Sequence, residues 1–119
     1  MTWSLNDTKP IWMQLCDQLV QRIATGIYPR GSRMPAVREL AAEAGVNPNT
    51  MQRALAQLEQ DGLAKADRTA GRLVTQDTAI LDAVRRAEAH VVVNQYYHAM
   101  AELGYSQQEA TAMLKEEHT

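Results

Sequence analysis

The sequence predicts a mainly α-helical protein with one small β-hairpin, and three observations lead to this fold class. Apolar residues recur every three or four positions in three segments before residue 62, which is the spacing of amphipathic helices. Two short strand-like runs follow, separated by turn residues, as expected of a hairpin. Helical spacing then returns from about residue 77. The 119 residues suit one compact domain with an accessory segment.

The chain is expected to begin with an extended arm, since its first ten residues contain Asp7, Lys9 and Pro10. An amphipathic helix is predicted next, because every fourth residue is apolar: Ile11, Leu15, Leu19 and Ile23. Gly26 ends this helix, and residues 28–32 are predicted to form a turn.

Two shorter helices are predicted after the turn. The first spans about residues 36–44, and Gly45 stands at the position where a left-handed residue commonly ends a helix. The second begins at Asn47, a good N-cap, with Pro48 in the first helical position. Its apolar face consists of Met51, Ala54, Leu55 and Leu58. Gly62 lies just past its expected end.

The hairpin is predicted from strands at residues 63–66 and 72–75, with residues 67–71 as an exposed tip. Three helices followed directly by a hairpin is the element order of a winged helix-turn-helix. In such a domain the third helix is the recognition element. The fold class is therefore a winged helix-turn-helix N-terminal domain, residues 1–75, with a helical C-terminal region, residues 76–119.

The C-terminal region is predicted to hold a long helix over about residues 77–103, although the run of valines at 91–93 favours a strand by propensity. Gly104 breaks it, and the Ser106 to Glu109 spacing of a capping box starts a last helix that continues to about Lys115.

The outer face of the predicted third helix carries amides, a hydroxyl and a guanidinium, and no carboxylate over its first two turns. At 100° per residue this face consists of Asn49, Gln52, Arg53 and Ala56, with Thr50 at the flank. Asn and Gln pair with adenine, and Arg pairs with guanine. An ordinary solvated helix face is the alternative interpretation.

The charge distribution permits a nucleic-acid partner without demonstrating one. The chain has a net charge of −2, but residues 1–75 hold nine Lys and Arg against seven Asp and Glu, or +2. Residues 76–119 hold three against seven, or −4. A mildly basic front is thus joined to an acidic tail.

Long ordered motifs in the first 75 residues resemble the N-terminal module of GntR-type regulators. They occupy residues 10–15 (Pro-Ile-Trp-Met-Gln-Leu), residues 26–41 (including Met-Pro-Ala-Val-Arg-Glu-Leu) and residues 45–55 (Gly-Val-Asn-Pro-Asn-Thr-Met-Gln-Arg-Ala-Leu). The Asn-Pro-Asn-Thr start and the short tail are similar to the YtrA subfamily. The likeness is close over residues 8–75, and over the tail it extends to length and helical character.

This resemblance implies a DNA-binding transcriptional regulator, most simply a repressor, and it implies which residues contact DNA. Carried over position by position, these are Arg38, Asn47, Asn49, Thr50, Gln52, Arg53, Gly71 and Arg72. A structural alternative exists for each of them. In these alternatives, Asn47 serves only as a cap, Arg38 pairs only with a nearby glutamate, and Arg72 is only a solvated strand residue.

The sequence departs from the family pattern at three places. Ala36 stands where a serine is common, so a hydroxyl that caps the helix or meets a phosphate is absent. Asp67 near the wing tip weakens attraction to phosphate, although Arg68 and Arg72 offset it. Trp12 replaces a frequent tyrosine and is expected to pack the arm against the domain.

Residues 76–119 are expected to form a homodimer, because so short a last helix cannot cover the apolar stripe of the long one. A dimer places two recognition helices on an inverted-repeat operator. Folding of the tail onto its own domain is the alternative. An inter-chain site for a small-molecule effector of unknown identity is a further interpretation of the tail, lined by Tyr96, Tyr97, Met100, Leu103 and Tyr105. Plain dimer core is the simpler one.

The residues do not predict an enzyme, a metal site or a cofactor. His90, His98 and His118 lack ligand spacing, and Cys16 is expected to be a buried filler with no base beside it. The sequence has no run of apolar residues long enough to span a membrane and no secretory signal, and it has a single cysteine. The expected location is therefore the cytoplasm. The rival interpretation is a winged-helix protein-interaction module without DNA binding.

Overall fold

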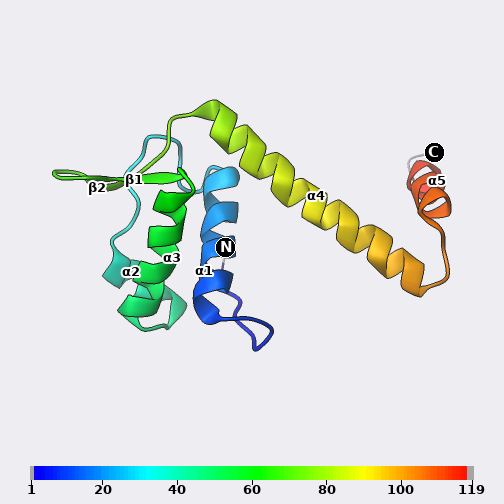
Figure 1. Ribbon diagram of the computed structural model, residues 1–119, viewed down its shortest axis with the longest axis horizontal. Helices are drawn as coiled ribbons and strands as arrows, with labels where there is room; N and C mark the ends of the chain where they lie inside the picture. The colour runs from blue at the N-terminus through cyan, green and yellow to red at the C-terminus, as the bar shows by residue number, and fades with distance from the viewer. Residues whose placement is uncertain (1, 118–119) are drawn as a thin grey trace. The chain divides into compact units, whose positions relative to one another are not determined.

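The structure, a computed structural model, describes residues 2–117 and divides into two compact units, the first ending at Arg85 and the second beginning at Arg86. Figure 1 labels its elements: α1 (Ile11–Ala24), α2 (Val37–Ala44), α3 (Pro48–Gln60), β1 (Ala64–Asp67), β2 (Gly71–Val74), α4 (Thr78–Glu102) and α5 (Gln107–Glu117). The predicted order of helices and hairpin is confirmed. The first turns of α4 belong to the first unit, which therefore extends past residue 75.

The core of the first unit forms where α1 and α2 pack against α3, and Figure 1 shows α1 and α3 side by side. Each helix contributes the residues that its apolar spacing predicted, and the fully buried ones include Leu15, Leu19, Leu40, Met51, Leu55 and Leu58. Cys16 is buried with them, as expected. Ile80, Leu81 and Val84 at the start of α4 pack against the same core.

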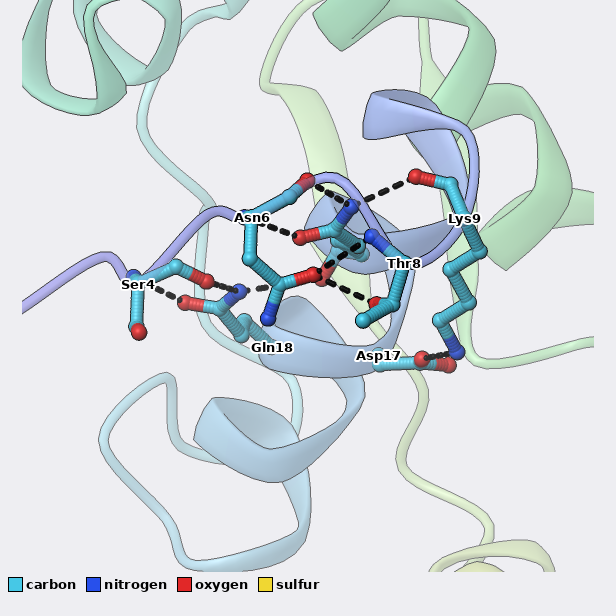
Figure 2. Close-up of polar contacts among 7 residues, drawn as sticks. Ser4, Asn6, Thr8, Lys9, Asp17 and Gln18 are labelled. Carbon is cyan, nitrogen blue, oxygen red and sulfur yellow. Dashed lines mark hydrogen bonds and ion pairs between the residues drawn. The ribbon is translucent and has the colours of Figure 1, made fainter.

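The arm before α1 is extended and is fastened to α1 by two glutamines (Figure 2). The side chain of Gln18 accepts a hydrogen bond from the backbone N–H of Ser4 at 2.9 Å and donates to the Ser4 carbonyl at 2.7 Å. Gln14, which is buried, makes the same pair of bonds with the backbone of Asn6. These bonds satisfy backbone groups that have no strand partner.

A buried arginine at the end of α1 joins the arm to α2. Arg22 is 3% exposed, and its guanidinium carbon lies 4.0 Å from the centroid of the Trp3 ring. Its Nη1 donates to Glu43 Oε1 at 2.9 Å and to the Tyr28 hydroxyl at 2.7 Å, while Trp3 Nε1 also donates to Glu43. Hydrogen bonds from Arg22 and Trp3 lower the pKa of the Glu43 carboxyl.

A three-residue link, residues 45–47, joins α2 to α3. Gly45 adopts φ +71°, the left-handed conformation expected of a residue just past a helix end, and Val46 N–H donates to the Ala41 carbonyl at 3.0 Å. Asn47 caps α3, accepting from the Asn49 backbone N–H at 2.8 Å, and Pro48 is the first helical residue. Both predictions for this link are confirmed.

The hairpin strands pair antiparallel, with Ala64 opposite Val74 and Asp67 opposite Gly71. The strands were predicted one residue away from these bounds. The difference arises at Asp67, whose carboxylate accepts from the backbone N–H groups of Thr69 and Ala70, both at 2.9 Å. This closes the turn over three residues. On the other edge of β2, Arg33 forms a bridge with Leu73.

The second unit consists of the rest of α4 and α5. The valines at 91–93 are helical, so their strand propensity does not prevail. The predicted capping box is confirmed, because Ser106 and Glu109 exchange hydrogen bonds at 2.9 and 3.1 Å. The Tyr96 hydroxyl donates to the Ala110 carbonyl at 2.7 Å, and Ala110 is fully buried. Within residues 2–117, no helix combines the length and apolarity needed to cross a membrane.

Candidate nucleic-acid interface

The outer face of α3 is polar, exposed and free of carboxylates over its first turns. Asn49, Gln52 and Arg53 are exposed, whereas Thr50 is half-buried at the flank, and the first turn holds no acidic residue. The opposite face is fixed in the core by Met51, Ala54, Leu55 and Leu58, all with 0% exposure. This buried stripe determines which side chains α3 presents to solvent.

The N-terminus of α3 combines an exposed cap with the positive end of the helix dipole. The Asn47 oxygen satisfies the N–H of Asn49, so the capping role that sequence reasoning gave as an alternative is present, while its amide group remains exposed. The first turn of a helix carries a partial positive charge, which suits a phosphate.

Arg38 lies on the exposed face of α2. Sequence reasoning left open that it only pairs with a nearby glutamate. Among the described residues, none of the ion pairs involves Arg38. Its guanidinium is therefore available to an external anion.

Arg53 is held by an aromatic side chain from another helix. Its guanidinium carbon lies 4.3 Å from the centroid of the Trp12 ring, in the first turn of α1. Trp12 was expected to pack the arm against the domain. The ring that anchors the arm is Trp3, and Trp12 stacks on the recognition helix instead.

The tip of the wing depends on Gly71, which adopts φ +83° and is exposed. Side chains rarely tolerate this conformation, so a glycine is needed where the hairpin turns. At the other end of the tip, hydrogen bonds from the backbone of Ala70 and Thr69 lower the pKa of the Asp67 carboxyl. The wing tip consequently carries a fixed negative charge beside the exposed Arg68.

Arg72 points back to the recognition helix rather than out from the wing. Its Nε donates to Glu59 Oε1 of α3 at 2.5 Å, and the two side chains are 16% and 32% exposed. The role of Glu59 as the partner of Arg72 was not predicted from the sequence. The two residues are 13 positions apart, so no local spacing indicates the pair.

Arg33 is the second residue that sequence reasoning missed. It is exposed at the edge of β2, and a Cβ atom built on Gly71 meets Arg33 Nε at 3.6 Å. The Arg33 guanidinium therefore lies beside Gly71 at the wing tip. Only the bridge between Arg33 and Leu73, 40 positions along the chain, reveals this neighbourhood.

The two histidines in the described part of the chain, His90 and His98, belong to no candidate metal site there. His98 lies 3.5 Å from Glu102, one turn along α4, and both side chains are highly exposed. His118 lies outside the described residues. Within residues 2–117, no group of three or more His, Cys, Asp or Glu side chains is placed to hold a metal ion.

Comparison with known proteins identifies the family to which this fold belongs. The family model for bacterial regulatory proteins of the gntR family matches residues 13–74, from α1 to the end of the wing. The chain belongs to the gntR family. It is therefore a helix-turn-helix transcriptional regulator, and the resemblance found in the sequence is confirmed.

Two gntR-type relatives from Bacillus subtilis (strain 168) carry the similarity further. The chain is 31% identical over 108 residues to the uncharacterized HTH-type transcriptional regulator YhcF, covering 91% of this chain and 89% of YhcF. It is 34% identical over 68 residues to the HTH-type transcriptional repressor YtrA, covering 57% of this chain and 52% of YtrA.

A solved gntR structure agrees with the whole architecture. The GntR family transcriptional regulator from Listeria monocytogenes superposes with a TM-score of 0.82 at 31% identity, covering 94% of this chain and 98% of that chain. The winged helix-turn-helix with a C-terminal helical region is thus shared beyond the residues that the family model matches.

Proposed function

We propose that this gntR-family chain is a homodimeric repressor that reads an inverted-repeat operator through α3 and touches the DNA backbone with α2 and the wing. The observation that carries the proposal is the outer face of α3, exposed and free of carboxylates where Asn49, Gln52 and Arg53 lie. The major groove accepts such a helix, and amide and guanidinium groups match base edges and phosphates.

The proposed contact residues divide into those that contact bases and those that contact phosphates. Asn49 and Gln52 face outward from the first turns of α3, and their amides suit the paired donor and acceptor of adenine. The side chains of Thr50 and Asn47, at the positive end of α3, suit a phosphate. Arg38, which has no ion-pair partner among the described residues, supplies a second phosphate contact from α2.

At the wing, we assign the cationic contact to Arg33 rather than to Arg72. Arg72 is tied to Glu59, whereas Arg33 is exposed beside Gly71. Gly71 lets the backbone of the wing approach the DNA closely, because no Cβ stands in the way. Arg72 then acts on DNA indirectly by fixing the wing to α3.

The C-terminal region, residues 76–119, which includes the second unit, is proposed as the dimerisation region. It exposes Val91, Val92, Val93, Leu103 and Leu114, with Val92 at 63% and Leu103 at 73%. Exposed apolar side chains on this scale are typical of a surface that a partner covers. A two-fold axis through such a contact gives two copies of α3 and hence an operator with two related half-sites.

Repression, location and effector binding follow as further parts of the proposal. Repression is supported by the relative YtrA, which is named a transcriptional repressor. We also propose that the chain performs no catalysis and that it acts on DNA in the cytoplasm of a bacterium. A small effector between the tails has weaker support, since the hydroxyls of Tyr96 and Tyr97 are used by α5 in the same chain.

The proposal is tested by fluorescence anisotropy of the full chain on its own upstream DNA and on a scrambled duplex, at two salt concentrations. The wild type should prefer the specific duplex by roughly a thousandfold or more. Gln52→Ala should lose about 1–3 kcal/mol on the operator and little on the scrambled duplex. Arg38→Ala should weaken binding to both and reduce the salt dependence.

Each remaining outcome has a distinct meaning. Arg30→Ala, which removes a charge from the turn after α1, serves as the matched control and should leave the preference intact. Equal affinity of the wild type for both duplexes contradicts a specific upstream operator. Absence of binding to either duplex at low salt contradicts DNA recognition altogether and favours the protein-interaction module.

A further inference from the structure

Trp12 and Arg53 form a contact between two helices on the surface proposed to meet DNA. Trp12 lies in the first turn of α1 and Arg53 in the second turn of α3, 41 positions along the chain. The guanidinium carbon is 4.3 Å from the ring centroid, within the range of a cation–π interaction. Arg53 is exposed and Trp12 is half-buried, so the stack lies at the protein surface.

The packing of the core does not explain Trp12. Its neighbour Ile11 is one of the partly buried hydrophobic residues packed against the core, and Leu15 one turn on is fully buried. Within the described part of the chain, Trp12 is not among the hydrophobic residues packed against that core. The large side chain of Trp12 therefore lies beside α3, where Arg53 contacts its ring.

The stack restricts Arg53 without consuming its hydrogen-bond donors. A guanidinium that lies over an aromatic face keeps its five N–H groups along its edge. It also loses rotamer freedom before DNA arrives, which lowers the entropic penalty of a later contact. A side chain held against the Trp12 ring is directed toward α1 and is less free to extend from α3 to the bases of a groove.

We propose, resting on the DNA-binding function above, that Trp12 is a positioning residue that holds Arg53 for a phosphate contact at the seam of α1 and α3. Arg53 then contributes affinity that is independent of sequence, while the amides of Asn49 and Gln52 carry the base reading. Tryptophan is the best of the aromatic residues for this contact.

The test is a double-mutant cycle on the full chain with operator and scrambled duplexes over a range of salt. Arg53→Ala should weaken both duplexes by similar factors and reduce the salt slope by about 0.9. Trp12→Leu should weaken both by about two- to fivefold, the range of an exposed cation–π contact. Trp12→Leu combined with Arg53→Ala should bind no more weakly than Arg53→Ala alone, and Trp12→Phe should retain most of the affinity.

Controls and contrary results separate this inference from the function on which it rests. Met13→Ala removes an exposed side chain beside Trp12 and should leave binding unchanged. If Arg53→Ala weakens only the operator, Arg53 reads a base and the phosphate assignment is wrong. If the two substitutions are additive, Trp12 does not act through Arg53. No binding by the wild type removes the proposed function and this inference together.

A second readout needs no DNA. In a Trp3→Phe background Trp12 is the sole tryptophan, so its fluorescence reports on the stack directly. Arg53→Ala should make Trp12 more accessible to acrylamide quenching, whereas Arg30→Ala should not. Equal quenching before and after Arg53→Ala contradicts the stack in solution and overturns the proposal, even if DNA binding by the wild type is intact.

Discussion

The two units of this chain bury their apolar side chains to very different extents. Among residues 2–117, every buried hydrophobic side chain belongs to the first unit except Ala110. The first unit therefore closes a core from its own three helices and hairpin, whereas the second leaves valines and leucines in solvent. An isolated helical segment of this kind is marginal in water. We therefore expect the first unit to be stable by itself, and the second to gain stability from the association proposed above.

Deleting part of the core should give the largest effect and break the first half of the comparison. Leu55 on α3 is 0% exposed and lies in the core between the helices. Leu55→Ala should lower the free energy of unfolding by about 2–5 kcal/mol, because it removes apolar contacts and leaves a cavity. Urea denaturation followed by circular dichroism measures this. Ala56→Ser on the exposed face of the same helix is the control, and an equal loss for both substitutions contradicts the assigned core.

A charge on the tail should separate folding from association. Val92 is 63% exposed on α4, so Val92→Glu should leave the first unit folded while weakening the homodimer at least tenfold, which corresponds to about 1.4 kcal/mol. Sedimentation velocity over a range of protein concentration measures the dimer. Glu102→Gln at the end of α4 is the control. An unchanged dimer in Val92→Glu shows that the interface lies elsewhere.

Loosening α5 from α4 should have a smaller effect, confined to the second unit. Tyr96→Phe removes the hydrogen bond from the Tyr96 hydroxyl to the Ala110 carbonyl. We expect a loss of about 1 kcal/mol, the typical net contribution of such a bond. Hydrogen exchange of the α5 amides should accelerate while the amides of α3 stay protected. Acceleration in both units contradicts their independence.

The smallest expected effect depends on pH and lies in the first unit. Because Arg22 and Trp3 donate to Glu43, the pKa of its carboxyl is lower in the folded chain than in the unfolded one. The stabilisation is thus fully present above the unfolded-state pKa of about 4.3 and is lost as pH falls through the folded-state pKa. Glu43→Gln should destabilise by about 1 kcal/mol at pH 7, discounted because Glu43 is half exposed.

The difference between Glu43→Gln and the wild type should shrink as the pH is lowered toward 3. Thermal unfolding at a series of pH values measures this convergence. Glu39→Gln, one turn earlier on α2, is the control. A difference that stays constant with pH shows that the carboxylate charge of Glu43 is not what stabilises the arm.

What the sequence predicted well is what a single turn of chain determines. The cap at Asn47, the left-handed Gly45 and the exchange between Ser106 and Glu109 depend on residues at most three positions apart. Helical periodicity gave the buried stripe of α3, and with it the exposed face of the candidate site. The contact residues named for DNA remain predictions, since they need a complex to test them.

What the sequence did not predict depends on residues far apart along the chain. Three contacts form only when the helices pack: Arg22 with Glu43, Arg72 with Glu59, and Arg53 with Trp12. The sign of a residue's charge does not say which neighbour will neutralise it. For this reason Arg72 was named at the wing and Arg33 was not, although the folded chain leaves Arg33 the more exposed of the two.

The ion pair between Arg72 and Glu59 has a consequence for how the proposed DNA-binding surface responds to the shape of DNA. Leu63 N–H donates to the Leu58 carbonyl at 2.9 Å, so the hairpin begins directly from the end of α3, and the ion pair fastens it a second time at β2. The hydrogen bond at Leu63 and the ion pair thus hold the wing against α3 at two points. In the proposed complex, a wing held to α3 in this way responds to the width of a groove as well as to its bases. Base pairs that no side chain touches can then still alter affinity through DNA shape.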